Sequence, residues 1–325
     1  RGTVDPSEMA PPLAPRMKML PVIDVAPLLD PQSSLAERER AAREIGDACR
    51  EIGFFYVTNH GVPDSHRELL FDRAKAFFDL PNEEKMKVFI GKSEHFRGYI
   101  PLGGEVTKGL KDWHESLDLR SEFAENHPAV LAGKPLHGPN QWPEEPPELR
   151  GVLEDHFTYM QNLGQALTRG LALSLGLEEA FLKPFVDEAF CNMRILHYPL
   201  PESDDPSVGL GIGPHIDYGF LTILDQDQAG GLEVVDASGD WVPVGPVPDA
   251  YLVNIGRVTQ IWTNDLYKAT EHRVRTVPRD RYSVPFFFNP NFDSLIEPLE
   301  VCVSADNPPR YEPYRHGEFL AERCQ

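Results

Sequence analysis

A histidine and an aspartate stand two residues apart in the motif GPHIDYG, as His215 and Asp217. The surrounding pattern predicts a short strand, and alternate residues of a strand face the same side, so both side chains are expected to converge on one point. An imidazole and a carboxylate are two of the three ligands of the facial triad that binds iron(II) and leaves coordination positions open. The pair alone is weak evidence, because His66 and Glu68 have the same spacing on a predicted helix.

A third ligand has to come from a distant strand, because neighbouring residues do not reach the remaining corner of one face. His272, in the segment TEHRVRT, lies on such a predicted strand. His215, Asp217 and His272 are therefore the candidate metal ligands, and we expect no catalytic side chain beyond them.

An arginine and a serine share one face of a further predicted strand, RYSVPFF, as Arg281 and Ser283. A guanidinium pairs bidentately with a carboxylate, and a serine hydroxyl donates to the same oxygens. The pair predicts a buried site that binds the distal carboxylate of a keto-diacid. Phe286 and Phe288, which alternate further along this strand, are expected to pack in the core.

Composition excludes some classes of protein. The 325 residues carry a formal net charge of −20, whereas nucleic-acid binders need clustered lysine and arginine. No apolar run approaches the roughly 18 residues of a membrane helix. The four cysteines are far apart and match neither a disulfide framework nor a zinc knuckle, which favours a reducing cytoplasm.

The first half of the chain carries helical patterns. Apolar residues recur at helical spacing over 35–52 and 149–177, and further helices are expected over 63–80 and after Pro81. Residues 93–146 are rich in glycine, proline and isolated aromatics, which is typical of binding loops or lids.

The second half changes to short apolar or alternating stretches between turn residues. Strands are predicted at Cys191–His197, Phe220–Asp225, Gly231–Val235, Trp241–Val244, Ala250–Asn254, Thr259–Ile261, His272–Thr276 and Tyr282–Phe288. Two segments near the start, LPVIDV and GFFYVTNHGV, are also strand-like. Many short strands with regular turns favour a β-sandwich or barrel. The outline is an α+β fold, with a helix-rich first part packed on a β-rich second part.

The order of the motifs resembles the isopenicillin N synthase-like branch of the 2-oxoglutarate/iron(II)-dependent dioxygenases, and its bacterial members in particular. The resemblance covers nearly the whole chain, from LPVIDV and GFFYVTNHGVP through MRILHYP, PHIDYGFLTIL, GGLEV and NIGRVTQIWTNDLYKATEHRV to RYSVPFFFNP. It implies a double-stranded β-helix (jelly roll) core flanked by N-terminal and long central helices.

The resemblance also implies the cofactors. The three candidate ligands would bind iron(II), and Arg281 and Ser283 would bind the distal carboxylate of 2-oxoglutarate. Tyr198 matches a tyrosine that adds a hydrogen bond to that carboxylate in several members. Asp217 separates the chain from related halogenases, which replace this carboxylate. With O₂, the expected reaction oxidises a small molecule, usually by hydroxylation, and releases succinate and CO₂.

Arg194 and the loop GYIPLGGEVTKG resemble parts of the bacterial ethylene-forming enzyme. The likeness implies that Arg194 lies beside the cosubstrate. Contacts with the substrate are expected for Glu105, Thr107, Tyr218, Arg97 and Tyr99. A cationic substrate would meet Glu105, whereas a substrate with a carboxylate would meet an arginine that does not bind 2-oxoglutarate.

Two positions depart from the family pattern. Leu196 replaces the asparagine of the usual NYYP motif, and Arg257 replaces the acid of the usual NIGD motif. The exchange at Arg257 could alter a charge pair or the rim of the pocket.

We expect one catalytic domain. Residues 1–16 are predicted to be a disordered or expression-derived tail, and 17–325 a single dioxygenase domain. Its parts are a helix-rich segment (17–185, with lid loops 93–146), a jelly roll (186–300) and a C-terminal segment (301–325). We expect a small-molecule substrate, no nucleic-acid or membrane partner, and a monomer or weak homo-oligomer in the cytoplasm.

Other functions remain open at this point. An oxidase that omits 2-oxoglutarate, as isopenicillin N synthase does, would use Arg281 and Ser283 to grip a substrate carboxylate. A non-catalytic jelly-roll binding protein would need a damaged triad, and the triad is intact. A zinc hydrolase could use similar ligands, but the arginine–serine pair argues against it.

Overall fold

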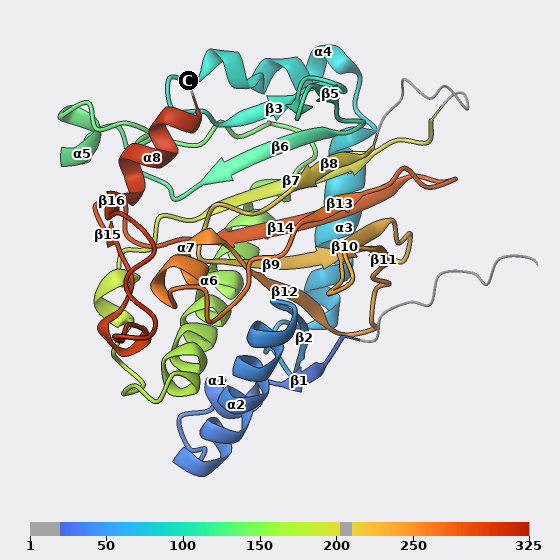
Figure 1. Cartoon of the computed structure of the whole chain (residues 1–325). Coiled ribbons are helices and arrows are strands. Elements are labelled where there is room, and N and C mark those ends of the chain that lie inside the picture. Colours follow the sequence, from blue (N-terminus) through green and yellow to red (C-terminus); the bar gives the residue numbers. More distant parts are fainter. Residues whose placement is uncertain (1–19, 202–209, 325) are drawn as a thin grey trace, which may run out of the picture.

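The computed structural model describes residues 20–201 and 210–324 (Figure 1). The predicted tail 1–16 lies outside the described residues. The helices are α1 (Ala26–Leu29), α2 (Leu35–Glu51), α3 (Asp64–Phe78), α4 (Asn82–Lys85), α5 (Pro128–Leu131), α6 (Leu149–Ser174), α7 (Arg257–Trp262) and α8 (His316–Arg323), with 3-10 turns at Met86–Val88, Ile90–Lys92, Lys183–Phe185 and Glu300–Cys302.

The long helices form where the apolar spacing predicts them. In α2, Ser34 and Glu37 make a reciprocal capping box that satisfies free amides at the N-terminus. The helix then buries Ala41, Ile45 and Ala48 on one face. Figure 1 shows α3 and α6 crossing behind the strands, and both helices contact the large sheet.

An eight-stranded sheet forms the larger wall of the core, in the order β1-β2-β12-β9-β14-β7-β6-β3. Only the β1–β2 pair among these is parallel. The strands of this sheet are β1 (Val22–Asp24), β2 (Phe54–Thr58), β12 (Tyr251–Ile255), β9 (Leu221–Gln226), β14 (Arg281–Phe288), β7 (Asn192–Tyr198), β6 (Glu115–Arg120) and β3 (Gly98–Ile100).

A four-stranded antiparallel sheet forms the opposite wall, in the order β11-β10-β13-β8. Its strands are β11 (Trp241–Pro243), β10 (Leu232–Val235), β13 (His272–Val274) and β8 (Ile212–His215). Two further sheets have two strands each: a hairpin of β4 (Val106–Thr107) and β5 (Leu110–Lys111), and a pair of β15 (Leu295–Ile296) with β16 (Tyr314–Arg315). A cluster including Leu196, Leu252, Val234 and Val274 fills the space between the walls. The two antiparallel walls form the expected jelly-roll core.

The large sheet separates two environments by the alternation of its strands. Along β14, Phe286 and Phe288 are fully buried in the main core against the helices. Arg281 and Ser283 point the other way, toward the small sheet. The core positions predicted for both phenylalanines are therefore confirmed.

Two predictions about elements were wrong. Thr259–Ile261 was predicted to be a strand, but it lies in α7. The strand preference of β-branched residues is weak and gives way to tertiary packing. Here Thr259 and Ile261 are both buried on a helical turn. Residues 93–146 were predicted to be mainly loop, yet they supply β3 and β6, two strands of the large sheet.

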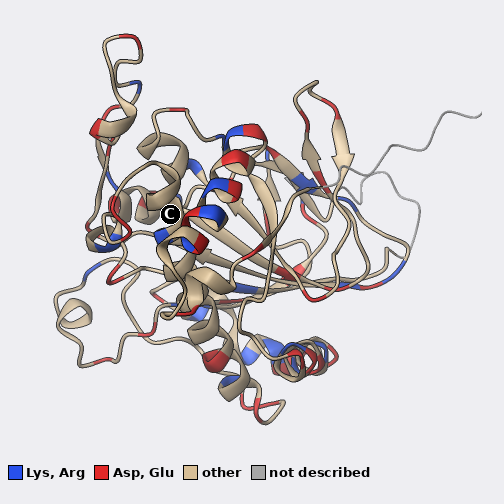
Figure 2. Ribbon diagram, turned by 90° about the horizontal axis from the view of Figure 1, so that it is seen from below, with Lys and Arg blue, Asp and Glu red and all other residues tan. Residues whose placement is uncertain are grey.

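Charge is mixed over the surface. Figure 2 shows acidic and basic residues interspersed along the helices. Among the described residues, no helix is long and apolar enough to cross a membrane.

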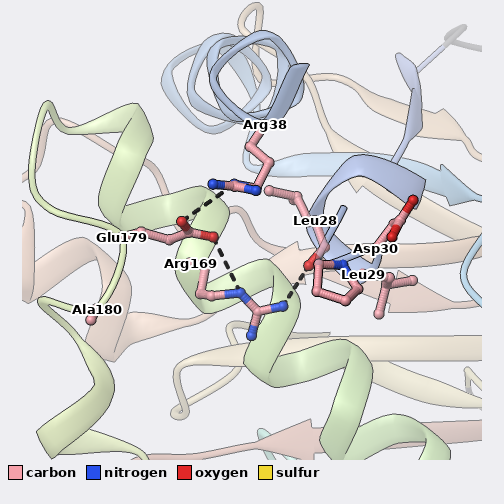
Figure 3. A pocket seen from close by; sticks show the side chains of 8 residues that line it. Leu28, Leu29, Asp30, Arg38, Arg169, Glu179 and Ala180 are labelled. Atoms are coloured by element: carbon pink, nitrogen blue, oxygen red, sulfur yellow. Dashed lines mark hydrogen bonds and ion pairs between the residues drawn. The ribbon is translucent and has the colours of Figure 1, made fainter. Parts of the chain in front are cut away.

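A surface cavity of about 390 Å³ lies between α1, α2 and α6 (Figure 3). Glu179 pairs with Arg38 at 3.3 Å and with Arg169 at 3.4 Å, so one carboxylate joins the two helices. None of the candidate metal ligands lines this cavity. We interpret these ion pairs as structural contacts between helices.

Candidate metal centre and its surroundings

The two candidate histidine ligands face each other across the small sheet. His215 on β8 pairs in register with His272 on β13, and the two ring centroids are 4.3 Å apart. Nε2 of His215 lies 3.5 Å from Asp217 Oδ1, and Nε2 of His272 lies 3.6 Å from the same oxygen. All three ligand atoms lie within 4.8 Å of one another, so the structure brings the predicted triad together.

Hydrogen bonds to backbone carbonyls orient both rings. Nδ1 of His215 lies 2.9 Å from the carbonyl oxygen of Gly213, and Nδ1 of His272 lies 3.1 Å from that of Thr270. Because a carbonyl only accepts, each Nδ1 carries the proton and each Nε2 keeps a free lone pair. This tautomer is the one that a metal ligand requires.

Asp217 reaches the site by a turn. The prediction that it shares a strand face with His215 was wrong, because β8 ends at His215. The chain then turns, and the Asp217 carbonyl accepts a 2.8 Å bond from the Arg257 amide. Oδ2 of Asp217 accepts hydrogen bonds from Thr222 (2.5 Å) and Asn254 (2.7 Å), which leaves Oδ1 for the histidines.

The electrostatics keep this aspartate ionised. Burial alone would raise the pKa of Asp217, but the neighbouring His272 and His215 and the bond from Asn254 together hold that pKa well below its usual range. Burial lowers the pKa of His272. An ionised carboxylate beside two imidazoles, with all three atoms aimed at one point, fits a divalent metal of intermediate softness such as iron(II).

Close backbone packing requires a glycine beside the triad. A Cβ atom on Gly256 would lie 2.2 Å from the Gly219 carbonyl oxygen and 3.0 Å from that of Asp217. Any side chain there would push the Asp217 turn away. The glycine of the motif NIGR is thus explained by the approach of two backbones.

Arg281 and Ser283 lie together on the inner face of the large sheet. Both are 1% exposed. The Arg281 guanidinium donates to Ser283 Oγ at 3.1 Å, to Gln226 Oε1 at 3.1 Å and to the Gly230 carbonyl at 2.7 Å, and it lies 4.6 Å from the Tyr198 ring centroid. The structure therefore brings Tyr198 to the predicted arginine–serine pair.

The surroundings of Arg281 fit a carboxylate ligand. Nε2 of Gln226 is buried and has no partner among the described residues. The Gln226 side chain bonds to the Arg281 guanidinium, which also bonds to Ser283. The Ser283 hydroxyl in turn lies 3.4 Å from the Tyr198 hydroxyl. A cluster of donors without an acidic partner among the described residues is chemically suited to a carboxylate ligand.

Arg194, by contrast, is paired with acids. Its guanidinium donates to Asp118 at 2.9 Å, to Ser116 at 3.0 Å and to Glu105. His114 Nε2 lies 2.7 Å from the same Glu105 oxygen, Oε2. Burial raises the pKa of Glu105, but Arg194 and His114 outweigh it and leave the pKa well below its usual range. Oε1 of Glu105 has no partner among the residues described.

Thr107 and Tyr218 have different surroundings. Thr107 donates to Asp112 at 2.6 Å. Tyr218, next to Asp217, is 47% exposed and packs edge-on against Phe319 of α8, and the Arg323 guanidinium lies 5.0 Å from its ring centroid. Helix α8 thus contacts the residue that follows a candidate metal ligand.

Arg97 and Tyr99 are fully buried outside this group. Arg97 donates to the carbonyls of His95, Leu136 and Ser121, and burial lowers its pKa to about 9. Tyr99 donates to Glu115, which faces the helices. These contacts explain both side chains as structural, and their predicted substrate roles gain no support.

Arg257 is exposed at the start of α7. Its guanidinium lies 5.6 Å from the Tyr311 ring centroid. Arg257 makes no ion pair with any of the described residues. No nearby carboxylate among them therefore takes the place of the acid that the usual NIGD motif has at this position.

Comparison with known proteins agrees with this geometry. The model described as "non-haem dioxygenase in morphine synthesis N-terminal" matches residues 20–145. The model of the 2OG-Fe(II) oxygenase superfamily matches residues 190–290, which include the triad and Arg281.

Relatives cover almost the whole chain. Homoarginine-6-hydroxylase 2-ODD-233 of Oryza sativa subsp. japonica is 36% identical over 94% of this chain and 96% of its own length. Among solved structures, a full-length Neurospora crassa protein in complex with α-KG and thymine has a TM-score of 0.82 and 29% identity, and covers 94% of this chain and 96% of its own. A putative 2OG-Fe(II) oxygenase family protein from Caulobacter crescentus has a TM-score of 0.81 and 31% identity, with 94% and 98% covered.

The chain belongs to the 2OG-Fe(II) oxygenase superfamily. It is an iron(II)- and 2-oxoglutarate-dependent dioxygenase that oxidises a small molecule with O₂ and releases succinate and CO₂.

Several residues around the site were missed in the sequence. Thr222 and Asn254 hold Asp217, and Gln226 completes the surroundings of Arg281. Thr222 and Gln226 share one face of β9 with Leu224, and Asp225 lies on the other face, so no regular polar alternation marked them in the sequence. His114 and Asp112 lie in a segment without such periodicity.

Proposed function

We propose that His215, Asp217 and His272 bind the iron, and that Arg281 and Ser283 bind the distal carboxylate of 2-oxoglutarate. The observation that carries this proposal is the convergence of three ligand atoms within 4.8 Å, with both histidine tautomers fixed for coordination. Tyr198 and Gln226 add donors to the carboxylate site. Arg194 acts beside the cosubstrate mainly by fixing Glu105.

The protein's own contribution is binding and orientation. When bound, iron(II) supplies the redox chemistry by which O₂ and 2-oxoglutarate oxidise the substrate. Arg281 fixes the far end of the cosubstrate by a charge-assisted pair, so its keto-acid end is directed toward the triad. Thr222 and Asn254 donate to one oxygen of Asp217, which keeps the other oxygen aimed at the proposed metal position.

The experiment that tests these assignments is an anaerobic titration with iron(II), followed by measurement of 2-oxoglutarate binding. We expect one equivalent of iron to bind, and 2-oxoglutarate to bind to the iron-loaded protein. A protein that stays unliganded under these conditions would contradict the assignment.

Within the superfamily, we place the chain in the isopenicillin N synthase-like branch. The motifs from LPVIDV to RYSVPFFFNP support this placement, as does the N-terminal match over residues 20–145. The loop around Glu105 groups it with bacterial members of that branch.

The substrate, we propose, carries a guanidinium or ammonium group that binds Glu105. Among the described residues Oε1 of this ionised carboxylate has no partner, and the side chain is 31% exposed, whereas the neighbouring Arg194 is held by two acids. Homoarginine, named for the relative from Oryza sativa, carries such a cation. Thr107 and Tyr218 are the further candidates for substrate contacts.

Succinate formation across a substrate panel tests this idea. We expect homoarginine, arginine or lysine to stimulate succinate release, and neutral thymine to have little effect. Glu105→Gln should raise KM for the cation about 10- to 100-fold, because a charge-assisted bond is lost. Turnover of neutral compounds alone would contradict the proposal, and oxidation without succinate would indicate the oxidase chemistry instead.

The chain is further proposed to act as a single-domain cytoplasmic enzyme, monomeric or weakly associated, without nucleic-acid or membrane partners. Its net charge of −20 and its unpaired cysteines support this assignment. Light scattering at several concentrations tests the oligomeric state.

A further inference from the structure

The β4–β5 hairpin lies directly against the strand that carries His215. A Cβ atom on Gly213 of β8 would lie 2.9 Å from Thr107 Cγ2 and 3.0 Å from Thr107 Cβ. Real Cβ atoms essentially never come closer than 3.0 Å to another group, so the hairpin would have to move. Glycine at this position allows the hairpin to dock on the ligand strand.

Asp112 joins the hairpin to that strand. The side chain is buried, at 3% exposed, and each carboxylate oxygen has its own partner. Oδ2 accepts the Thr107 hydroxyl at 2.6 Å, and Oδ1 accepts the Gly213 amide at 2.9 Å. The Asp112 amide donates to the Glu105 carbonyl at 3.1 Å, which ties the proposed substrate residue to the same unit.

The ligand strand needs this carboxylate because its pairing is irregular. His215 faces His272 and Ile212 faces Val274, and the register shifts between these two pairs. Within the shift, Pro214 has no amide hydrogen, and the Gly213 amide bonds to Asp112 in place of a ladder partner. A buried amide without an acceptor is costly, so the carboxylate completes the strand at this irregularity.

The same peptide orients the metal ligand. The Gly213 carbonyl accepts the proton of His215 Nδ1 at 2.9 Å. The amide side of Gly213 is therefore fixed by Asp112, and its carbonyl side fixes the His215 ring. Groups of this kind, which orient a ligand without touching the metal, affect metal affinity strongly.

We propose that Asp112 is a positioning residue that couples docking of the β4–β5 hairpin to the orientation of His215. Both carboxylate oxygens are used within the protein, so Asp112 itself touches neither metal nor substrate. The inference rests on the proposed function for its assignment of His215 to iron. It predicts that the hairpin and the metal site respond together to changes at one buried carboxylate.

Two readouts that need no substrate test the coupling: anaerobic iron(II) affinity of the full chain, and hydrogen exchange of residues 105–112. Asp112→Ala should weaken iron(II) binding about 10- to 100-fold and speed exchange in the hairpin. Asp112→Asn keeps an acceptor for the Gly213 amide, and its NH₂ group donates to the Thr107 hydroxyl instead of accepting from it, so iron affinity should stay within about threefold of the parent protein. Thr107→Val removes the hydroxyl that donates to Asp112 but keeps the bond from the Gly213 amide, so it should speed hairpin exchange and weaken iron(II) binding less than Asp112→Ala does.

Gly213→Ala provides a second route if Asp112→Ala fails to fold. It displaces the hairpin while keeping the carboxylate, so it should change both readouts. If Asp112→Ala folds and binds iron(II) like the parent protein, or if Gly213→Ala alters neither readout, the coupling is wrong. If the parent protein itself binds no iron(II), the proposed function fails instead.

Discussion

The two faces of the large sheet share the same strands but differ in the side chains that they carry near the candidate site. The outer face packs apolar side chains such as Phe286 against α6, whereas the inner face carries Arg281, Ser283, Thr222 and Asn254. Because side chains alternate along a strand, residues next to each other in sequence serve different purposes. The comparison teaches that stability and ligand binding can be changed separately within β14.

The largest effect on function is expected at the inner site, at a metal ligand. His272→Ala removes one of three ligands, so iron affinity should fall by more than the roughly 100-fold seen for groups behind the ligands. Activity should fall to background while the melting temperature of the metal-free protein changes little. Anaerobic titration measures the loss, with His127→Ala, outside the site, as the control. Full iron affinity in His272→Ala would remove this residue from the triad.

The largest effect on stability is expected at the outer face. Phe286→Ala should lower the free energy of unfolding by about 3–5 kcal/mol, because it leaves a cavity beside Phe157. Denaturant titration measures this loss. KM for 2-oxoglutarate should not change in the folded fraction, and Phe181→Ala, at an exposed position, should cost little. A changed KM would show that the two faces are not independent.

A smaller effect is expected when the planar guanidinium of Arg281 is lost but its positive charge is kept. Arg281→Lys removes the bidentate geometry, and a charge-assisted hydrogen bond contributes about 1.5–3 kcal/mol. KM for 2-oxoglutarate should therefore rise roughly 10- to 100-fold, with stability nearly unchanged. Arg279→Lys, whose side chain is exposed, is the matched control. An unchanged KM would favour a different site for the cosubstrate.

The last effect is a dependence of stability on pH at the outer face, which is spread over several pH units. Burial lowers the pKa of His156 to about 3, and both ring nitrogens lack partners among the described residues. The unfolded chain binds the proton near pH 6.5, so stability should fall as the pH drops from about 6.5 toward 3, by at most about 1.4 kcal/mol per pH unit. His156→Leu should reduce that slope. An equal slope in both proteins would mean that other groups, such as His316, account for it.

The site could be predicted from sequence only where its residues stand in short motifs. His215, Asp217 and His272 have the spacing and residue types of a facial triad, and Arg281 and Ser283 alternate on one strand. Gln226 and Asn254 could not be chosen, because polar residues are common on strands. Their inward direction follows only from the order of strands in the sheet.

The fold was predictable where periodicity is strong. Helices α2, α3 and α6 follow their apolar spacing, and most strands of the second half lie where alternation predicts them. The strands β3 and β6 escaped because they lie in a segment rich in glycine, proline and isolated aromatics, and because the pairing of β6 with β7 is a long-range contact. The turn that carries Asp217 depends on the close approach of Gly256, which no local pattern reveals.

The contact of α8 with Tyr218 has a practical consequence. Phe319 and Arg323 pack on the residue next to Asp217, so this last helix forms part of the neighbourhood of the metal centre. An affinity tag or fluorescent fusion attached after Arg323 would be held close to the reaction it is meant to report. Purification handles for this enzyme therefore belong at the other terminus.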